Sequence, residues 1–470
     1  MLRPPRPRLR ANQPHKTDNR RMAEKYCIIT YGCQMNEHDS EIMEGLLRRR
    51  GYERTTDERT ADVVVFNTCC VREGAENRAI ARCESLRSAK EHNPRMVVAM
   101  SGCVAQDQGR RLLERIPHLD LVVGTRDYIH LPELIQRYLV DGERLVATED
   151  IDKPLSVNTV PVRQSGLRGF VNIMYGCNNR CTFCIVPKTR GEEWSRPVDD
   201  VVHEVRAMVT QGYREVTLLG QNVNSYMTET REDFADLLHA LNGIDGLWRI
   251  RYTTSNPKSC RDRHIGAVAD CEKVMENLHL PVQSGNDRIL RLMKRAYNAK
   301  RYRYLVELFR EQNPLHSLTT DIIVGFPTET EEEFEETLRL VEEMRYDSAF
   351  MFMYSPRAGT VSADTMRDDV PLRVKKARLQ RLIDLQESIS AEKNREELGR
   401  VHEVLVEGPA KKDPEALQGR TRTDKMVVFR GNPRMVGNLV QVKVTGGTSH
   451  TLLAEAVTRE PEPLEAAPAT

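Results

Sequence analysis

Short runs of aliphatic and β-branched residues alternate with helical patterns along most of the chain. In the first series, the predicted strands are 26–30, 62–66, 96–100 and 121–123, and the predicted helices are 39–50, 73–91, 108–116 and 131–139. Strand, helix and next strand in this order are typical of parallel βαβ units. Residues 25–145 are therefore expected to form a small, doubly wound parallel sheet.

A second series of the same kind occupies residues 169–398. Its predicted strands are 169–174, 215–219, 248–254, 277–281, 318–324 and 348–354, and a long charged helix at 371–398 ends it. Six such units predict an open, partial (β/α)6 TIM-like barrel. Residues 146–168 lack periodicity and contain two prolines, which favours a linker between the two parts.

The pattern of hydrophobic and polar residues changes again near the C-terminus. Residues 399–460 alternate between β-branched and polar positions with glycine-rich turns, a pattern typical of a small all-β barrel. Residues 1–24 are basic and rich in proline, and residues 461–470 consist mainly of Pro, Ala and Glu. Both ends are therefore expected to be disordered tails.

Charge and cysteine content limit the classes of function. The 70 Lys and Arg residues nearly cancel the 69 Asp and Glu residues, so any nucleic-acid site must be a local basic patch. No apolar run reaches the length of a membrane span, which predicts a protein without membrane attachment. Eleven cysteines, an odd number in a long chain, fit a reducing compartment. We expect a cytoplasmic protein in which cysteine binds metal or takes part in catalysis.

The chain contains two cysteine triplets. The second in chain order, Cys177, Cys181 and Cys184, lies in YGCNNRCTFC directly after the first strand of the predicted barrel. Three thiolates on one loop can surround a single soft centre, either zinc or an iron-sulfur cluster. Structural zinc sites are closed by a fourth ligand, and the nearest histidine, His203, lies on a predicted helix. We therefore favour a [4Fe-4S] cluster whose fourth iron is free to bind a substrate or cofactor.

The first cysteine triplet, Cys33, Cys69 and Cys103, is spread over three loops, each just past the end of a strand. In a doubly wound sheet the loops beyond neighbouring strands share one edge, so the three thiols should meet. The alternative is three unrelated buried thiols. Four other cysteines are expected to pack in the core: Cys27, Cys83, Cys260 and Cys271. We expect Cys70 to be a bystander.

A basic hairpin in the C-terminal part suggests an RNA-binding face. QGRTRTDKMVVF brings Arg420, Arg422 and Lys425 together, and small β-barrels commonly bind nucleic acid on such a face. The alternative is an ordinary solvated pair of strands. A second basic segment, 286–310, is either a surface for an anionic partner or a solvated helix face.

The two triplets, in this order, resemble the radical S-adenosylmethionine methylthiotransferase family. TYGCQMNEHDSE, GCNNRCTFCIVPKTRGEEWSRP, LHLPVQSGNDRIL and TDIIVGFPTETEEEFEETL are similar to the branch that modifies N6-dimethylallyladenosine in tRNA. The resemblance implies an N-terminal methylthiotransferase domain at 25–145, a radical core at 169–398 and an RNA-binding TRAM domain at 399–460. It also implies two [4Fe-4S] clusters and S-adenosylmethionine, with methylthiolation at C2 of the adenosine next to the anticodon.

Further residues are predicted to bind the cofactor. Phe183 matches the aromatic residue usual in the family's cysteine loop, and the alternative is an ordinary packed ring. The others are Gln283, Ser284, Gly285, Gly325 and Pro327, which fall at C-terminal strand ends where barrel active sites lie, and the loop residue Arg196; each could equally be a loop or turn residue. The expected partners are tRNA, an electron donor such as flavodoxin or ferredoxin, and an iron-sulfur or sulfur carrier, acting on a monomer. The alternatives are a sister methylthiotransferase for threonylcarbamoyladenosine or a ribosomal aspartate, and a noncatalytic iron-sulfur protein.

Overall fold

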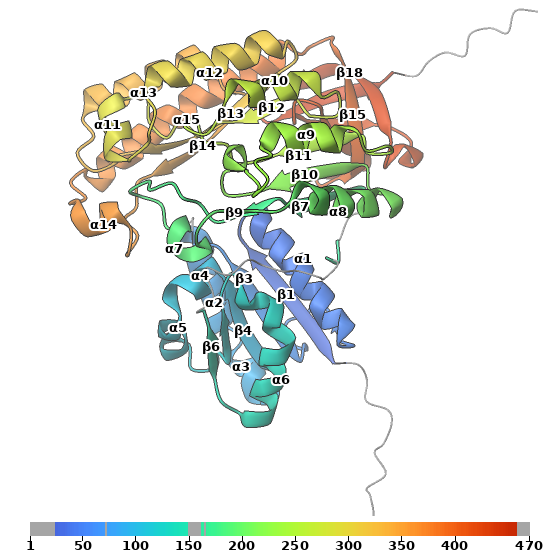
Figure 1. The fold of residues 1–470 in the computed structure, drawn as a ribbon, viewed down its shortest axis with the longest axis vertical. Coiled ribbons are helices and arrows are strands. Elements are labelled where there is room, and N and C mark those ends of the chain that lie inside the picture. Colours follow the sequence, from blue (N-terminus) through green and yellow to red (C-terminus); the bar gives the residue numbers. More distant parts are fainter. Residues whose placement is uncertain (1–23, 71–72, 149–160, 164–165, 458–470) are drawn as a thin grey trace, which may run out of the picture.

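The computed structural model describes residues 24–70, 73–148, 161–163 and 166–457, arranged in three parts (Figure 1). The N-terminal part lies at the bottom of the view, the partial barrel above it, and the C-terminal β-barrel at one end of the partial barrel. Both predicted tails lie outside the described residues, apart from Glu24, as does most of the predicted linker.

The N-terminal part contains one parallel six-stranded sheet, in the order β2-β1-β3-β4-β5-β6. Its strands are β1 Lys25–Tyr31, β2 Glu53–Arg54, β3 Val63–Thr68, β4 Val97–Gly102, β5 Leu121–Val123 and β6 Leu145–Ala147. The doubly wound prediction is confirmed. The two edge strands, β2 and β6, were not predicted.

The helices of this part differ more from the prediction than its strands do. They are α1 Gln34–Arg49, α2 Glu73–Glu84, α3 Arg87–His92, α4 Cys103–Gln108, α5 Arg110–Arg115 and α6 Leu131–Asp141. The predicted helix 73–91 is broken in two: the Ser85 hydroxyl donates to the Arg82 carbonyl, and the next residue, Leu86, turns into the core. Helices α1 and α4 begin at the cysteine loops, earlier than predicted.

The central part is an open arc made of two three-stranded parallel sheets. The first sheet has the order β11-β10-β7 and the second has the order β12-β13-β14. A parallel bridge between Ile250 and Val274 connects the two sheets. The strands are β7 Arg168–Asn172, β10 Glu215–Leu219, β11 Arg249–Tyr252, β12 Asn277–His279, β13 Ser317–Val324 and β14 Ser348–Met353. The prediction of a partial barrel with six strands is confirmed.

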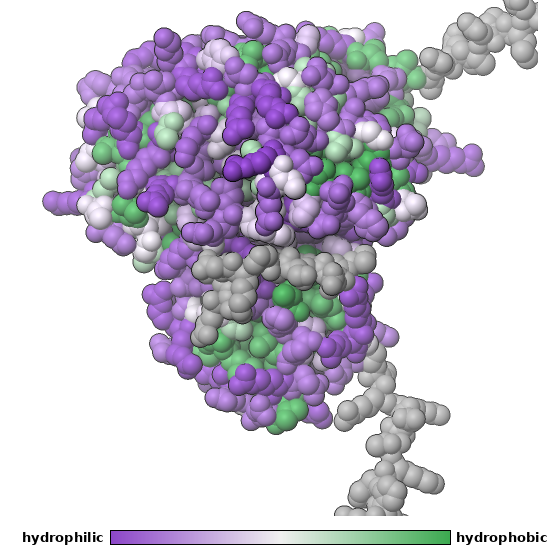
Figure 2. All heavy atoms as spheres, in the orientation of Figure 1, coloured by the Kyte–Doolittle hydropathy of each residue, from purple (hydrophilic) through white to green (hydrophobic). Residues whose placement is uncertain are grey.

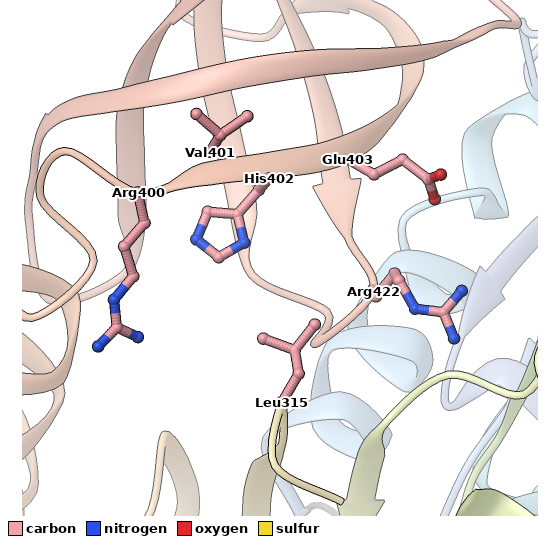
Figure 3. Close-up of a pocket in the computed structure, with 6 residues that line it drawn as sticks. All are labelled: Leu315, Arg400, Val401, His402, Glu403 and Arg422. Atoms are coloured by element: carbon pink, nitrogen blue, oxygen red, sulfur yellow. The ribbon is translucent and has the colours of Figure 1, made fainter.

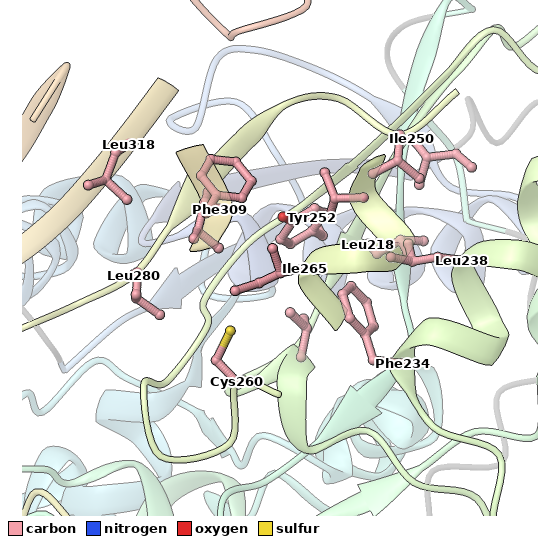
Figure 4. Packing of buried hydrophobic residues seen from close by; sticks show 14 of the residues in the cluster. Leu218, Phe234, Leu238, Ile250, Tyr252, Cys260, Ile265, Leu280, Phe309 and Leu318 are labelled. Atoms are coloured by element: carbon pink, nitrogen blue, oxygen red, sulfur yellow. The ribbon is translucent and has the colours of Figure 1, made fainter. Parts of the chain in front are cut away.

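Helices cover the outside of this arc and pack on its buried strands. They are α8 Val198–Thr210, α9 Phe234–Asn242, α10 Asp262–Asp270, α11 Asp287–Leu292, α12 Ala299–Gln312, α13 Glu331–Met344 and α15 Leu372–Arg395, with short α7 Val186–Arg190 and α14 Val361–Thr365. Figure 4 shows Phe234 and Leu238 of α9 beside Leu218 of β10 and Ile250 of β11. Each such buried side chain contributes roughly 1.5–3 kcal/mol of hydrophobic free energy. Cys260 lies in this core, as predicted.

The C-terminal part is a closed barrel in the order β15-β16-β17-β19-β18. Its strands are β15 Val401–Ala410, β16 Asp413–Thr421, β17 Met426–Arg430, β18 Leu439–Gly447 and β19 Thr451–Ala456. Alternate side chains such as Val404, Val406, Val427, Phe429 and Val442 fill its interior. This agrees with the prediction, because a period of two places every second residue inside.

Buried arginines of β11 join the barrel to the central part. Arg249 is fully buried and donates to the carbonyl oxygens of Arg420 and Glu403 at 2.7 and 3.1 Å, and to the Glu403 carboxylate at 2.8 Å. Arg251 donates to the Thr421 carbonyl at 2.8 Å. The barrel is therefore fixed on the edge of the first three-stranded sheet.

The surface seen in Figure 2 is mostly hydrophilic, with separate small hydrophobic patches. Within the described residues, none of the helices combines the length and apolar character that a bilayer crossing requires.

Candidate iron-sulfur sites

The first cysteine triplet gathers at one edge of the N-terminal sheet. Cys33 follows β1, Cys69 follows β3, and Cys103 begins α4 directly after β4. Because these three strands are neighbours, their loops share the carboxyl edge. The Cys69 thiol contacts the thiols of both Cys33 and Cys103. The predicted meeting of the three side chains is therefore confirmed, and their role as iron ligands stays a prediction.

Hydrogen bonds and close backbone contacts hold the three loops together. Asn36 accepts from the Cys33 backbone N–H at 3.4 Å and donates to Asn67 Oδ1 and the Thr68 carbonyl at 3.1 and 3.2 Å. Thr68 Oγ1 donates to the Ser101 carbonyl at 2.6 Å. Gly102 has φ +88°, and a Cβ there would lie 2.4 Å from the Thr68 carbonyl oxygen. The sequence analysis missed these asparagines, which stand three residues after Cys33 and two before Cys69.

Cys70, which the sequence predicts to be a bystander, lies against the first triplet. Its thiol interacts with that of Cys103 and with Thr189. Residues Cys69, Cys70 and Cys103 are buried, whereas Cys33 is exposed. Four thiols thus lie together, and the group opens to solvent on the Cys33 side. The four cysteines predicted to pack in the core are all buried: Cys27, Cys83, Cys260 and Cys271.

Arg190, which the sequence analysis did not select, places a buried cation beside the first triplet. Its Nη2 lies 2.8 Å from Asp39 Oδ2, and both side chains are almost fully buried. Contact with Cys69 lowers the pKa of the Cys33 thiol to about 7, and the Arg190 charge acts in the same direction. Contacts with Cys69 and Cys70, followed by Arg190, hold the pKa of Cys103 well below its usual value. Thiolates are the form that binds iron.

The second cysteine triplet lies on a loop that follows the short strand β8, Met174–Tyr175. The Cys177 N–H donates to the Gly191 carbonyl at 3.1 Å, and the Cys184 N–H donates to the Cys181 carbonyl at 3.1 Å. Gly176 has φ +74°, and its lack of a side chain lets the cysteine loop pass close to the backbone at Glu192. A Cβ at residue 176 would lie 1.9 Å from the Glu192 carbonyl oxygen. Burial raises the pKa of Cys184 to about 12.

Polar groups contact the sulfur atoms of this loop. Asn179 Nδ2 lies 3.4 Å from Cys177 Sγ, and Arg295 Nη1 lies 3.4 Å from Cys181 Sγ. Arg295 also donates to the Pro281 carbonyl at 2.9 Å and is buried. For Arg295, burial excludes both interpretations of the basic segment 286–310, a surface for an anionic partner and a solvated helix face. The guanidinium instead provides positive charge where thiolates would gather.

Short helix α7 connects the two triplets. It begins two residues after Cys184 and ends at Arg190, beside the first triplet. Thr125 Oγ1 donates to the Thr189 carbonyl at 2.6 Å, and Arg126 Nη2 donates to the Arg190 carbonyl at 3.2 Å. These hydrogen bonds from the N-terminal part hold the segment that follows the second triplet. The two groups of cysteines therefore have fixed positions relative to each other.

Several predicted cofactor-binding residues lie in tight turns near the second triplet. Gln283 has φ +70° and its N–H donates to the Asp321 carbonyl at 2.8 Å. The Ser284 hydroxyl accepts from the Asn286 N–H at 3.2 Å. A Cβ at Gly285 would lie 2.6 Å from Thr337 Cα, so this turn sits directly on α13. Their contact with a cofactor stays a prediction.

The remaining predicted cofactor-binding residues are likewise held by the protein itself. Phe183 packs against a small cluster that includes Phe326. Arg196 donates to the Asn172 carbonyl and to Glu204, both at 2.7 Å. Gly325 has φ +69° and its N–H donates to Glu329 at 2.6 Å, while Pro327 is buried in the same loop. None of these contacts tests a role in binding S-adenosylmethionine.

The predicted RNA-binding residues lie where the barrel meets the central part. Arg422 Nη2 is 2.6 Å from Glu276, and Lys425 Nζ is 3.0 Å from Asp347. Arg420 pairs with Asp424 at 3.1 Å. An RNA phosphate would have to compete with these carboxylates.

A depression of about 480 Å³ lies at the same junction, away from the cysteines (Figure 3). Its lining residues are Leu315, Arg400, Val401, His402, Glu403 and Arg422.

The described residues contain no three His, Cys, Asp or Glu side chains arranged as ligands of a single metal ion. The fit to iron-sulfur clusters rests instead on the chemistry of the donors. Each triplet offers three sulfur atoms with a buried guanidinium beside them, and this combination suits an anionic cluster with thiolate ligands.

Comparison with known proteins gives the same division of the chain. The family model named Uncharacterized protein family UPF0004 matches residues 25–124, the Radical SAM superfamily model matches 171–341, and the TRAM domain model matches 395–457. A tRNA-2-methylthio-N(6)-dimethylallyladenosine synthase from Carboxydothermus hydrogenoformans is 50% identical over 91% of this chain and 98% of its own length. The chain belongs to this synthase family. It is an enzyme of the radical S-adenosylmethionine methylthiotransferase type.

Other relatives agree at the levels of family and fold. A synthase of the same name from Clostridium beijerinckii is 47% identical over 92% of this chain and 95% of its own length. Among solved structures, the radical S-adenosylmethionine methyltransferase TsrM from Kitasatospora setae aligns with a TM-score of 0.51 at 14% identity, covering 73% of this chain and 77% of that one. This likeness supports the fold of a sheet domain joined to a partial barrel.

Proposed function

We propose that this chain transfers a methylthio group to C2 of N6-dimethylallyladenosine beside the anticodon of tRNA, using S-adenosylmethionine and two [4Fe-4S] clusters. The observation that carries the proposal is the pair of cysteine triplets joined by α7, in a chain of this synthase family. A sulfur-donating site and a radical-generating site must act on one adenine, so their fixed relation suits the reaction.

The residues divide between the two sites. Cys177, Cys181 and Cys184 would hold one cluster, and Cys33, Cys69 and Cys103 the other. When bound, the clusters supply an electron that cleaves the S-adenosylmethionine sulfonium and a site for the transferred sulfur. Around them the chain supplies the positive charge of the buried Arg190 and Arg295, so that the anionic groups are held in a fixed place.

Other cations of the C-terminal barrel are better placed to meet tRNA than the predicted hairpin. Lys411, Lys412, Arg434 and Lys443 are exposed, and within the described residues they form no ion pair. We assign the nonspecific, salt-dependent part of tRNA binding to these side chains.

The reaction also requires partners beyond tRNA. An electron donor such as flavodoxin or ferredoxin would reduce the second-triplet cluster, and an iron-sulfur or sulfur carrier would rebuild the other. We place the reaction in the cytoplasm, where tRNA and a reducing environment occur together.

Mass spectrometry of tRNA nucleosides tests the function. A deletion strain should lose 2-methylthio-N6-dimethylallyladenosine and accumulate N6-dimethylallyladenosine. The wild-type chain should restore the modified nucleoside, and Cys33→Ala should not. Cys83→Ala is the matched control, because Cys83 is a buried core residue of the same sheet domain. Persistence of the modified nucleoside in the deletion strain would refute the proposal.

A second assay separates an enzyme from a noncatalytic iron-sulfur protein. Anaerobic incubation of the chain with dithionite and S-adenosylmethionine should yield 5′-deoxyadenosine. Cys181→Ala should abolish this product, whereas Cys271→Ala, a buried cysteine on the outer side of the barrel core, should leave it unchanged.

A further inference from the structure

Exposed cations without partners gather around α11. Arg291 and Arg339 line a depression of about 410 Å³ between α11, α12 and α13. Lys294 follows α11, and Lys300 lies in the first turn of α12. All four side chains are exposed, and within the described residues none of them forms an ion pair or a side-chain hydrogen bond. We call these four residues the α11 surface.

The carboxylates around this depression leave an excess of positive charge. Two of the arginines that line it, Arg288 and Arg303, pair with carboxylates of α13 at 2.5 and 2.8 Å. The two acidic residues that line it, Asp287 and Glu336, accept hydrogen bonds from neutral groups of the fold at 2.7 and 2.8 Å. The remaining two arginines and the neighbouring lysines therefore present their charge to solvent.

The α11 surface lies directly on the loop of the second cysteine triplet. Thr182 stands between the last two cysteines of this triplet, and its N–H and hydroxyl donate to the carbonyls of Met293 and Leu292 at 3.1 and 3.0 Å. Both carbonyls belong to the short segment from Arg291 to Lys294. The backbone that carries these exposed cations therefore contacts the cysteine loop itself.

The α11 surface is separate from the part of the molecule that we assign to tRNA. Figure 1 shows α11 at one end of the central part and the C-terminal β-barrel at the other end. A partner on the α11 surface therefore leaves the cations of the barrel accessible. Because the whole chain has a formal charge of only +1, attraction of an anionic partner must come from such a local surface.

We propose that the α11 surface is the docking site of an acidic one-electron carrier protein. This inference rests on the proposed function, in which the cluster of the second triplet must be reduced before S-adenosylmethionine is cleaved. In the docked complex one electron passes from the reduced carrier to that cluster, the carrier is oxidised by one electron, and no covalent bond forms or breaks. Charge complementarity steers the two proteins together and orients the carrier, as suits a small, transient redox interface.

The first test measures binding of an acidic flavodoxin to the reconstituted full-length chain by biolayer interferometry at several salt concentrations. The α11 variant carries Arg291→Gln, Lys294→Gln and Arg339→Gln. Each lost exposed ion pair corresponds to about a two- to fourfold change in affinity, so the three changes should weaken flavodoxin binding by about tenfold to sixtyfold. The binding that remains should depend less on salt.

The matched control removes the same charge at the other end of the molecule. It carries Lys411→Gln, Lys412→Gln and Arg434→Gln in the C-terminal barrel. This barrel variant should change flavodoxin binding by less than about twofold and should weaken tRNA binding. The α11 variant should keep tRNA binding within about twofold of wild type.

A small-molecule reductant separates lost docking from damage to the site. Dithionite needs no docking surface, so the α11 variant should form 5′-deoxyadenosine at the wild-type rate with dithionite. With reduced flavodoxin below saturation, the same variant should form it about tenfold more slowly. If the triple change also lowers the dithionite rate, Arg339→Glu decides, because this residue lies on α13 rather than beside the cysteine loop. It should weaken flavodoxin binding by about fourfold or more and leave the dithionite rate unchanged.

The outcomes are distinguishable. Absence of saturable flavodoxin binding to the wild-type chain, or equal weakening by the α11 and barrel variants, would overturn the docking site. Loss of tRNA binding instead of flavodoxin binding in the α11 variant would make this an RNA surface and would also overturn it. All three results leave the proposed function intact. A wild-type chain that forms no 5′-deoxyadenosine with dithionite would overturn the proposed function, whatever flavodoxin does.

Discussion

Arg249 is expected to be the main attachment of the C-terminal barrel to the catalytic core. Arg249→Met keeps most of the side-chain volume but removes three hydrogen bonds to the barrel. The Arg420 and Glu403 carbonyls then lose a donor, and an unsatisfied buried carbonyl costs about 1–3 kcal/mol. The Glu403 carboxylate is 31% exposed and can bind water instead. The loss of its hydrogen bond to Arg249 is therefore left out of the free-energy cost. We expect docking of the barrel to weaken by about 2–4 kcal/mol, a factor of roughly 30 to 1,000.

Hydrogen exchange measured by mass spectrometry gives this free energy directly. The turn at 421–425, whose amides bond within the turn, is held against the core by Ser317, which donates to the Thr423 carbonyl at 2.7 Å. Amides of the turn should exchange faster in Arg249→Met, while those inside the closed barrel stay protected. Arg214→Met is the matched control, because Arg214 precedes the neighbouring strand and stacks on Trp248 instead. Turn exchange within about 0.5 kcal/mol of wild type would refute the reasoning.

Three further predictions test the sites and the stability. Cys69→Ser should lose about four of eight irons per chain, and the neighbouring Cys70→Ser should lose none; equal losses would contradict the assignment of Cys69 as the ligand. Burial raises the pKa of Glu329 to about 7, so the folded state binds the extra proton between about pH 4.5 and 7. Wild-type stability should therefore fall as the pH rises through this window, and Glu329→Gln should flatten the dependence in urea unfolding; parallel curves would contradict this. Lys443→Gln should lower the salt slope of tRNA binding by about one, whereas Arg422→Gln should leave the slope unchanged; the reverse result would restore the hairpin as the RNA face.

The sequence alone determined the inner strands of the sheets and the meeting of the first triplet. Strands β5 and β10 coincide with their predicted ranges, because buried parallel strands are short continuous apolar runs bounded by polar turns. Cys33, Cys69 and Cys103 converge because each follows a neighbouring strand of one parallel sheet, and that geometry follows from topology. The motifs of both triplets also identified the family.

The tertiary structure decided which charges face the cysteines and which hold the domains together. Arg190 and Asp39 stand 151 positions apart in the chain, and Arg249 bonds to a carbonyl 171 residues away. Arg422 and Lys425 looked like a free basic face, yet carboxylates from the central part pair with them. The pattern of hydrophobic and polar residues along a chain predicts single helices and strands. Whether a charge meets solvent, a ligand or another side chain depends on contacts between distant elements, and only folding brings those elements together.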